Sequence, residues 1–188
     1  SKNVNPAGAV TSSYDESAVS PLAGIVFRPR ADISIYGNFT SGLTRGTTAP
    51  NTAANAGEVF APYKSKQYEM GVKMEQGSLV TGVSVFQIDR PNALTDPFTN
   101  IYSLDGKQRN RGLELSTMGE IVRDVRLMAS ATFFDATLAR SAGGVNDGKD
   151  EIGVPKRTFN LGADWDLPWV PGLSLNARAI YTAEAPFD

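Results

Sequence analysis

The feature that most constrains this chain is an alternation of apolar and polar residues in runs longer than ordinary strands. In 33–43 the apolar residues Ile33, Ile35, Phe39 and Leu43 stand at odd positions, and mainly polar residues lie between them. The same alternation recurs at 68–75, 159–167 and 173–181. Because successive side chains of a strand point to opposite faces, this period of two predicts strands with one apolar and one polar face. Helical periodicity is scarce, so the sequence predicts an all-β fold.

Turn-forming residues divide the chain into about eight predicted strands. We expect these strands at 20–30, 32–43, 64–76, 78–90, 107–119, 124–136, 154–167 and 172–183. Ordinary strands have about five or six residues, whereas a tilted membrane-spanning strand needs about nine to eleven. The predicted lengths therefore favour an antiparallel up-and-down meander that crosses a membrane.

The connections between the predicted strands alternate in length. Short ones are expected at 30–32, 76–78, 119–124 and 167–172, and long ones at 43–64, 90–107 and 136–154. Outer-membrane barrels have tight turns on the periplasmic side and long loops outside, whereas soluble sandwiches have no reason to sort loops by length. Residues 1–19 are expected to form a loop or irregular lead-in.

Composition excludes several classes of protein. The chain has no histidine and no cysteine, so it cannot build a Ser-His-Asp or Cys-His nucleophile, an ordinary zinc site or a His- or Cys-ligated haem. Its 18 basic and 20 acidic residues provide no general field for nucleic acid. We therefore expect no enzyme activity, no cofactor, no metal site and no nucleic-acid partner. The apolar fraction of 41% is below the usual level of about 45–50%, which fits a chain whose apolar face meets lipid.

Three stretches, at these intervals, resemble the C-terminal part of the barrel of TonB-dependent ferric-siderophore receptors. They are Pro62–Lys73 (PYKSKQYEMGVK), Val85–Arg90 (VFQIDR) and Gln108–Leu115 (QRNRGLEL). Residues 154–160 resemble a loop-to-strand entry near the end of that barrel, and 22–43 resembles an earlier hairpin. The resemblance covers nearly the whole chain beyond about residue 20.

The resemblance implies that 1–188 is part of a transmembrane barrel of about 22 strands in the bacterial outer membrane. The apolar face would then meet outer-membrane lipid, and the polar face would meet the lumen. A receptor of this kind binds ferric siderophores and imports them with energy from the TonB complex. We expect the plug domain, the N-terminal segment that contacts TonB and the closing strands to be absent from this chain.

Recognition of a ferric siderophore would need aromatic and cationic side chains near the long loops. The candidates in this chain are Phe60, Tyr63, Phe98, Tyr102, Arg45 and Arg109. The chelator itself would carry the iron, so no protein metal ligand is expected.

Two alternatives stay open at this point. One is a complete small outer-membrane barrel that acts as an anchor or adhesin, and the other is a soluble β-sandwich binding module. The first would begin and end on the long-loop side, whereas small complete barrels keep both termini on the short-turn side. Coordinates that show which way the apolar face points would separate these alternatives.

Overall fold

One antiparallel sheet dominates the computed structural model, which describes residues 2–4, 10–13 and 19–186. Its strands are β3 (Leu22–Arg30), β4 (Ile33–Thr44), β5 (Tyr63–Gln76), β6 (Leu79–Thr95), β7 (Tyr102–Val122), β8 (Val125–Arg140), β9 (Arg157–Asp166) and β10 (Ser174–Thr182). Two short strands, β1 (Lys2–Val4) and β2 (Val10–Ser13), pair with each other, and a short 3-10 helix η1 covers Ala142–Gly144. No helix among the described residues is long and apolar enough to cross a membrane.

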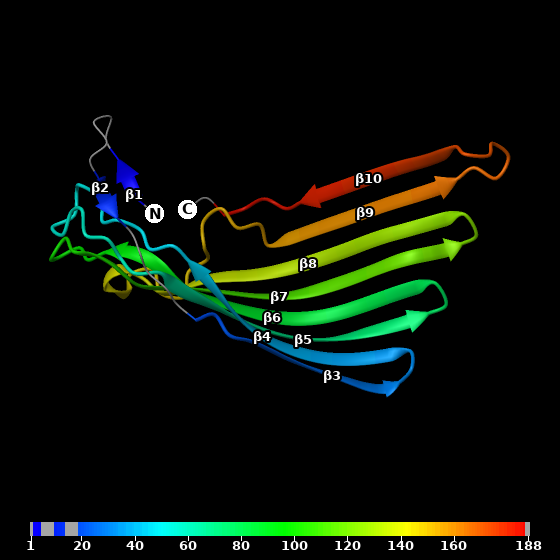
Figure 1. Cartoon of the computed structure of the whole chain (residues 1–188), viewed down its shortest axis with the longest axis horizontal. Coiled ribbons are helices and arrows are strands. Elements are labelled where there is room, and N and C mark those ends of the chain that lie inside the picture. The colour runs from blue at the N-terminus through cyan, green and yellow to red at the C-terminus, as the bar shows by residue number, and fades with distance from the viewer. Residues whose placement is uncertain (1, 5–9, 14–18, 187–188) are drawn as a thin grey trace.

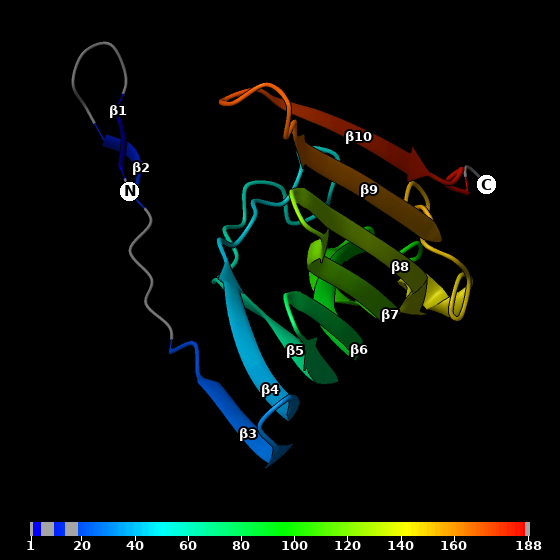
Figure 2. The same ribbon diagram turned by 90° about the vertical axis from the view of Figure 1, so that its right-hand side faces the viewer.

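The eight strands of the large sheet are hydrogen-bonded in the order β10-β9-β8-β7-β6-β5-β4-β3, and every neighbouring pair is antiparallel. The tight turns lie together at one end of the sheet, and the longer connections lie at the other (Figure 1). Seen along the strands, the sheet bends into an arc (Figure 2). The predicted all-β meander of about eight strands is therefore confirmed.

The sheet does not close on itself. Strand β3 pairs only with β4, and β10 pairs only with β9, so these two strands form open edges among the described residues. A complete eight-stranded barrel would pair β3 with β10, and a sandwich would stack a second large sheet on the first. The structure contradicts both alternatives.

The hairpin of β6 and β7 extends far beyond the predicted strand ends. The expected long loop at 90–107 is wrong, because its residues continue the ladder and leave only 96–101 as a connection. Pro91 lacks an N–H group and is usually confined to edges and bulges, so it indicates a strand end in the sequence. The ladder continues past it, with a register shift between Asn92 and Leu94.

Residues 1–19 also differ in part from the expected irregular lead-in, because β1 and β2 lie within this region. Short strands of three and four residues carry little periodic signal, so the alternation of the sequence does not reveal them.

Register places the apolar residues of neighbouring strands side by side on one face, which we call the apolar face. Ile35 lies opposite Val72, Phe39 lies opposite Tyr68, and the rings of the second pair are 5.1 Å apart. Met70 is 62% exposed and Leu161 is 51% exposed. Such exposure of large apolar side chains is expected for a wall that meets lipid rather than a dry core.

The opposite face, which we call the polar face, carries hydrogen-bonded side chains. The hydroxyl of Tyr36 donates to Glu69 at 2.7 Å, and the ammonium group of Lys73 lies 5.3 Å from the centre of the Tyr36 ring. The ring covers Gly71, where an added Cβ would come within 2.7 Å of the tyrosine oxygen. Tyr36 is therefore a polar-face residue. Trp165 and Trp169, whose rings pack edge to face at 5.2 Å, lie at the tight-turn end.

The two faces predict different costs for an introduced charge in the full-length protein. Leu161→Arg would place a cation on the apolar face and should lower the free energy of unfolding by about 2–4 kcal/mol in lipid. Asn160→Arg, one residue away on the polar face, should cost less than about 1 kcal/mol. Denaturant titration of the receptor in liposomes measures both, and equal costs would contradict the assignment of the faces.

Candidate functional site

The connections opposite the tight turns form the candidate site, because they gather beyond the same end of the sheet (Figure 1). They comprise 45–62 between β4 and β5, 96–101 at the tip of the β6–β7 hairpin, and 141–156 between β8 and β9. Loops on a rigid scaffold are the usual place for recognition.

The connection 45–62 is clamped onto the β6–β7 hairpin by Asn55. The side-chain amide of Asn55 donates to the carbonyl oxygen of Tyr102 at 2.8 Å and accepts from the N–H of Tyr102 at 2.9 Å. The N–H of Ala54 donates to the carbonyl of Asn100 at 2.8 Å, and the side chain of Asn100 returns a bond to the carbonyl of Thr52. These bonds satisfy the backbone at the start of β7 as a further strand would.

Apolar contacts accompany this clamp. The rings of Phe60 and Tyr102 meet nearly edge to face at 5.6 Å, a favourable geometry for aromatic pairs. Ala49 and Ala53 of the same connection are buried. Two of the predicted ligand-binding residues, Phe60 and Tyr102, therefore lie together on segments that are distant in the sequence.

The tip of the hairpin is a tight turn organised by Asp96. Its carboxylate accepts from the N–H groups of Phe98 and Thr99 at 2.9 and 2.8 Å, and these bonds lower the pKa of Asp96 below its ordinary value. Asn100 adopts φ 57°, which asparagine tolerates better than most residues. The side chain of Phe98 is 90% exposed at this tip.

The connection 141–156 folds back onto β8. Leu138 and Lys149 pair through their backbones at 2.9 Å, and the N–H of Glu151 donates to the carbonyl of Ala136 at 2.8 Å. The carboxylate of Asp147 accepts from the backbone and the hydroxyl of Ser141. The second long connection is thus also held by specific bonds.

A polar cluster around the buried Gln108 joins this connection to the polar face of the hairpin. Gln108 is completely buried, accepts a hydrogen bond from Arg90, and donates to Asn110 at 3.2 Å. The guanidinium of Arg90 also lies 3.7 Å from the carboxylate of Glu151. Burial raises the pKa of Glu151 above its ordinary value, and the charge of Arg90 only partly opposes this effect. One carboxylate oxygen of Glu151 has no hydrogen-bond partner among the described residues.

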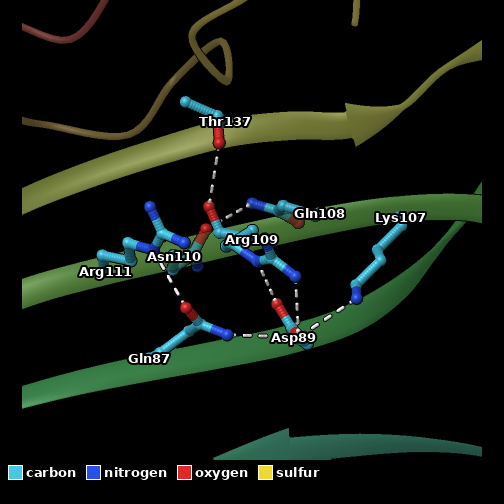
Figure 3. A network of polar contacts seen from close by, with 8 residues as sticks. All are labelled: Gln87, Asp89, Lys107, Gln108, Arg109, Asn110, Arg111 and Thr137. Atoms are coloured by element: carbon cyan, nitrogen blue, oxygen red, sulfur yellow. Dashed lines mark hydrogen bonds and ion pairs between the residues drawn. The ribbon is translucent and has the colours of Figure 1, made fainter. Parts of the chain in front are cut away.

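Arg109 belongs to a different environment from the other candidates. Its guanidinium donates to both oxygens of Asp89, at 2.7 and 3.2 Å, and Lys107 lies 3.1 Å from the same carboxylate (Figure 3). Register places Arg109 and Arg111 on the face of Leu113 and Leu115, which is the apolar face. Arg109 therefore points away from the polar face that Tyr63 shares.

The two remaining candidates lie at the base of the connection 45–62. Tyr63 is the first residue of β5 and lies opposite Thr44, and Arg45 directly follows β4. Both lie at the long-connection end of the sheet, as the sequence predicts.

Several residues that organise the site were not predicted from the sequence. Asn55 contacts a partner 47 positions away, which no local pattern indicates. Gln108 is two residues from Asn110, and Arg90 is two residues from Ile88, so both continue the polar-face positions of their strands. Extending the alternation beyond the membrane-spanning part of β6 and β7 would therefore have placed them on the polar face. Among the described residues no group of three His, Cys, Asp or Glu side chains is arranged to hold a metal ion.

An open single sheet with one lipid-compatible face and one polar face is a segment of the wall of a membrane-spanning barrel. The family model described as TonB dependent receptor-like, beta-barrel matches residues 1–188, so the chain belongs to this family. Receptors of this kind are β-barrels of the bacterial outer membrane, and this is where the chain is located.

Two curated relatives illustrate the similarity. The ferrichrome receptor FcuA of Yersinia enterocolitica is 37% identical over 173 residues, which cover 89% of this chain and 23% of the relative. The ferrichrome outer membrane transporter/phage receptor of Escherichia coli K12 is 32% identical over 139 residues, or 70% of this chain and 18% of the relative.

Among solved structures, the ferric preacinetobactin receptor BauA of Acinetobacter baumannii matches with 39% identity and a TM-score of 0.72. That match covers 87% of this chain and 25% of BauA. The chain thus spans about a quarter, or less, of the length of these proteins. The structural neighbours are 22-stranded barrels, and the sheet of this chain corresponds to a part of their wall.

The clamp predicts a specific loss of protection in the full-length protein. Asn55→Ala removes two hydrogen bonds to Tyr102 and should weaken docking of 45–62 by about 1–2 kcal/mol, or roughly 5- to 30-fold in the opening equilibrium. Hydrogen exchange at the amides of Ala54 and Tyr102 measures this opening equilibrium. Asn51→Ala, at an exposed position in the same connection, is the control and should leave the exchange rates unchanged.

The partly buried Glu151 predicts a pH-dependent effect. The pKa of Glu151 is raised in the folded state. The contribution of this group to stability is therefore present below pH 4.5, its ordinary pKa, and is lost as the pH rises through the folded pKa. Glu151→Gln should therefore slow amide exchange at Leu138 and Glu151 at pH 7.5, and wild type and variant should converge near pH 4. Faster exchange in the variant at pH 7.5 would show that the Arg90 contact outweighs the cost of burial.

Proposed function

We propose that the full-length protein is an outer-membrane receptor that binds ferric siderophores at the cell surface and imports them with energy from the TonB complex. This chain supplies eight strands of the barrel wall and the connections 45–62, 96–101 and 141–156 on the outer side. Its family is one of transport receptors, and relatives that cover most of this chain are receptors for ferrichrome and ferric preacinetobactin.

The observation that carries the proposal is that hydrogen bonds hold the outer connections in defined positions. Asn55 fixes 45–62 to the hairpin, and backbone hydrogen bonds from Leu138 to Lys149 and from Glu151 to Ala136 fix 141–156 to β8. A preorganised loop loses less conformational entropy when it binds a ligand, which favours affinity. An adhesin or simple anchor has no comparable need for it.

The ligand-contacting residues that we propose are the aromatic pair Phe60 and Tyr102, together with Tyr63 at the start of β5. An iron chelate presents flat, oxygen-rich surfaces, and phenol groups can stack on them and donate hydrogen bonds. Arg45 at the base of the same connection would add a cation for an anionic chelate. Phe98, exposed at the hairpin tip, would meet the ligand on approach. Arg109 is left out because it points to the opposite face.

The polar cluster of Arg90, Gln108 and Glu151 would support these contacts from the polar face. Its side chains join β6, β7 and the connection 141–156, so a ligand that displaces one segment would strain the others. Transfer of a bound chelate inward and coupling to TonB would depend on the rest of the receptor.

The proposal predicts that Tyr63→Ala combined with Tyr102→Ala weakens ferric-siderophore binding by about 1–3 kcal/mol, or roughly 5- to 150-fold. The affinity of the purified full-length receptor for ferrichrome and for ferric preacinetobactin, measured by fluorescence quenching, decides the matter.

Two further variants make this test specific. Tyr102→Phe keeps the ring against Phe60 and should lose only the part of the binding free energy that the hydroxyl contributes. Tyr181→Ala changes an aromatic residue at the same end of the sheet but on the apolar face. Tyr181→Ala should bind like wild type. Unchanged affinity in the double variant would remove these tyrosines from the site, and no saturable binding of any ferric siderophore by the wild type would contradict the proposed function.

A further inference from the structure

The apolar face changes character sharply near the outer end of the sheet. Val85, Leu113 and Phe133 lie side by side in register, and the next residues outward on the same face are Gln87, Arg111 and Asp135. Beyond these come Asp89 and Arg109. The change occurs at the same level in three adjacent strands, so it is a property of the wall and not of one strand.

The level of this boundary corresponds to the edge of a bilayer. Gln87 and Leu79 are eight positions apart on β6, and both lie on the apolar face. At about 3.3 Å per residue and a strand tilt of about 40°, this separation spans roughly 20 Å of height, close to the apolar band of about 25 Å in outer-membrane barrels. Arg111 and Arg109 therefore lie where lipid head groups begin.

Cations predominate on this part of the face. We call the following residues the outer-rim cation cluster: Lys66, Lys107, Arg109, Arg111 and Arg157. Two carboxylates, Asp89 and Asp135, lie among these five cations, which leaves an excess of three positive charges. The chain as a whole has a net charge of -2, so this excess is local.

The cluster is held in place by its own polar contacts. Asp89 draws Arg109 and Lys107 together, and the side-chain amide of Gln87 donates to Asp89 at 3.3 Å (Figure 3). The carbonyl of the same amide accepts from Arg111 at 2.9 Å. Arg111 thus donates to a neutral amide on one side, lies opposite the carboxylate-bearing Asp135 on the other, and has its side chain positioned in advance.

These cations cannot serve the lumen, because they share the face of the lipid-exposed residues. A guanidinium group matches a phosphate through two parallel hydrogen bonds, and long basic side chains commonly extend from an apolar surface to the head-group layer. At the tight-turn end the apolar face of β9 ends instead at Trp165, and the cation opposite Ile33, Arg30, is paired with Asp32. The asymmetry indicates that the outer leaflet supplies an anionic partner.

We propose that the outer-rim cation cluster binds the phosphate groups of a lipid in the outer leaflet, with its acyl chains along Val85, Leu113 and Phe133. Arg111 and Arg109 make the main phosphate contacts, and Lys66, Lys107 and Arg157 complete the positive field. This proposal rests on the outer-membrane location of the chain and is independent of the siderophore function.

Binding of diphosphorylated lipid A to the purified full-length receptor in dodecyl maltoside micelles tests the proposal, with native mass spectrometry as readout. Arg111→Gln should weaken binding by about tenfold, and Arg109→Gln with Arg111→Gln by more. Arg178→Gln removes a cation from the polar face of β10 and should leave binding unchanged. Lipid A without phosphates should bind the wild type as weakly as it binds the double variant.

The variant Asp89→Asn distinguishes direct lipid binding by the cluster from a general effect of substitutions on the structure of the wall. It removes the carboxylate that competes with phosphate for Arg109 and Lys107, so it should tighten lipid binding by several-fold, whereas general disruption of the wall would weaken it. Equal binding by wild type and Arg111→Gln, or equal binding of phosphorylated and dephosphorylated lipid A, would overturn the proposal. Displacement of the lipid by an equal concentration of inorganic phosphate would assign the cluster to a free anion and overturn it as well.

Discussion

Backbone hydrogen bonding in a medium without water is the constraint on which this structure depends. Inside a bilayer an unpaired N–H or C=O group costs several kcal/mol, so each strand must be paired along both of its edges. Strands β4 to β9 meet this requirement through their neighbours, whereas β3 and β10 each present one edge of nine residues without a partner strand among the described residues. The sheet is stable in a membrane only when further strands continue it on both sides.

The same ladder determines the chemistry of each face. A slip of one residue in any pairing would move every apolar side chain of a strand to the lumen and every polar one to the lipid. Through the membrane the pairing from β4 to β9 is regular. Register shifts occur near Asn92 and Gln108 at the outer end and near Glu120 at the tight-turn end, where water can satisfy the backbone groups that a bulge leaves unpaired. The polar cluster around Gln108 lies in this irregular region.

Most of the wall could be predicted from the sequence, because alternation and register are local properties. Met70 and Leu161 lie on the face that their position in the alternation predicts. The direction of Arg109 was not predicted by its closeness to a loop. Arg109 stands at the same phase of the alternation as Leu113 and Leu115, and this phase determines the face to which its side chain points. The docking of the connection 45–62 could not be predicted, because Asn55 and Tyr102 meet only through the folded hairpin and share no periodic pattern. Pro91 misled the prediction for a related reason, since continued pairing with β7 overrides its local tendency to end a strand.

The clamp at Asn55 binds the backbone of residue 102 and not its side chain. Any residue except proline offers the same N–H and carbonyl groups, so these two hydrogen bonds do not depend on the identity of that side chain, whereas the ring contact with Phe60 does. A substitution at position 102 can therefore change the surface chemistry of the hairpin while the hydrogen bonds from Asn55 persist. Two asparagines, Asn55 and Asn100, thus determine where the connection lies, and the side chains around them determine what its surface can bind.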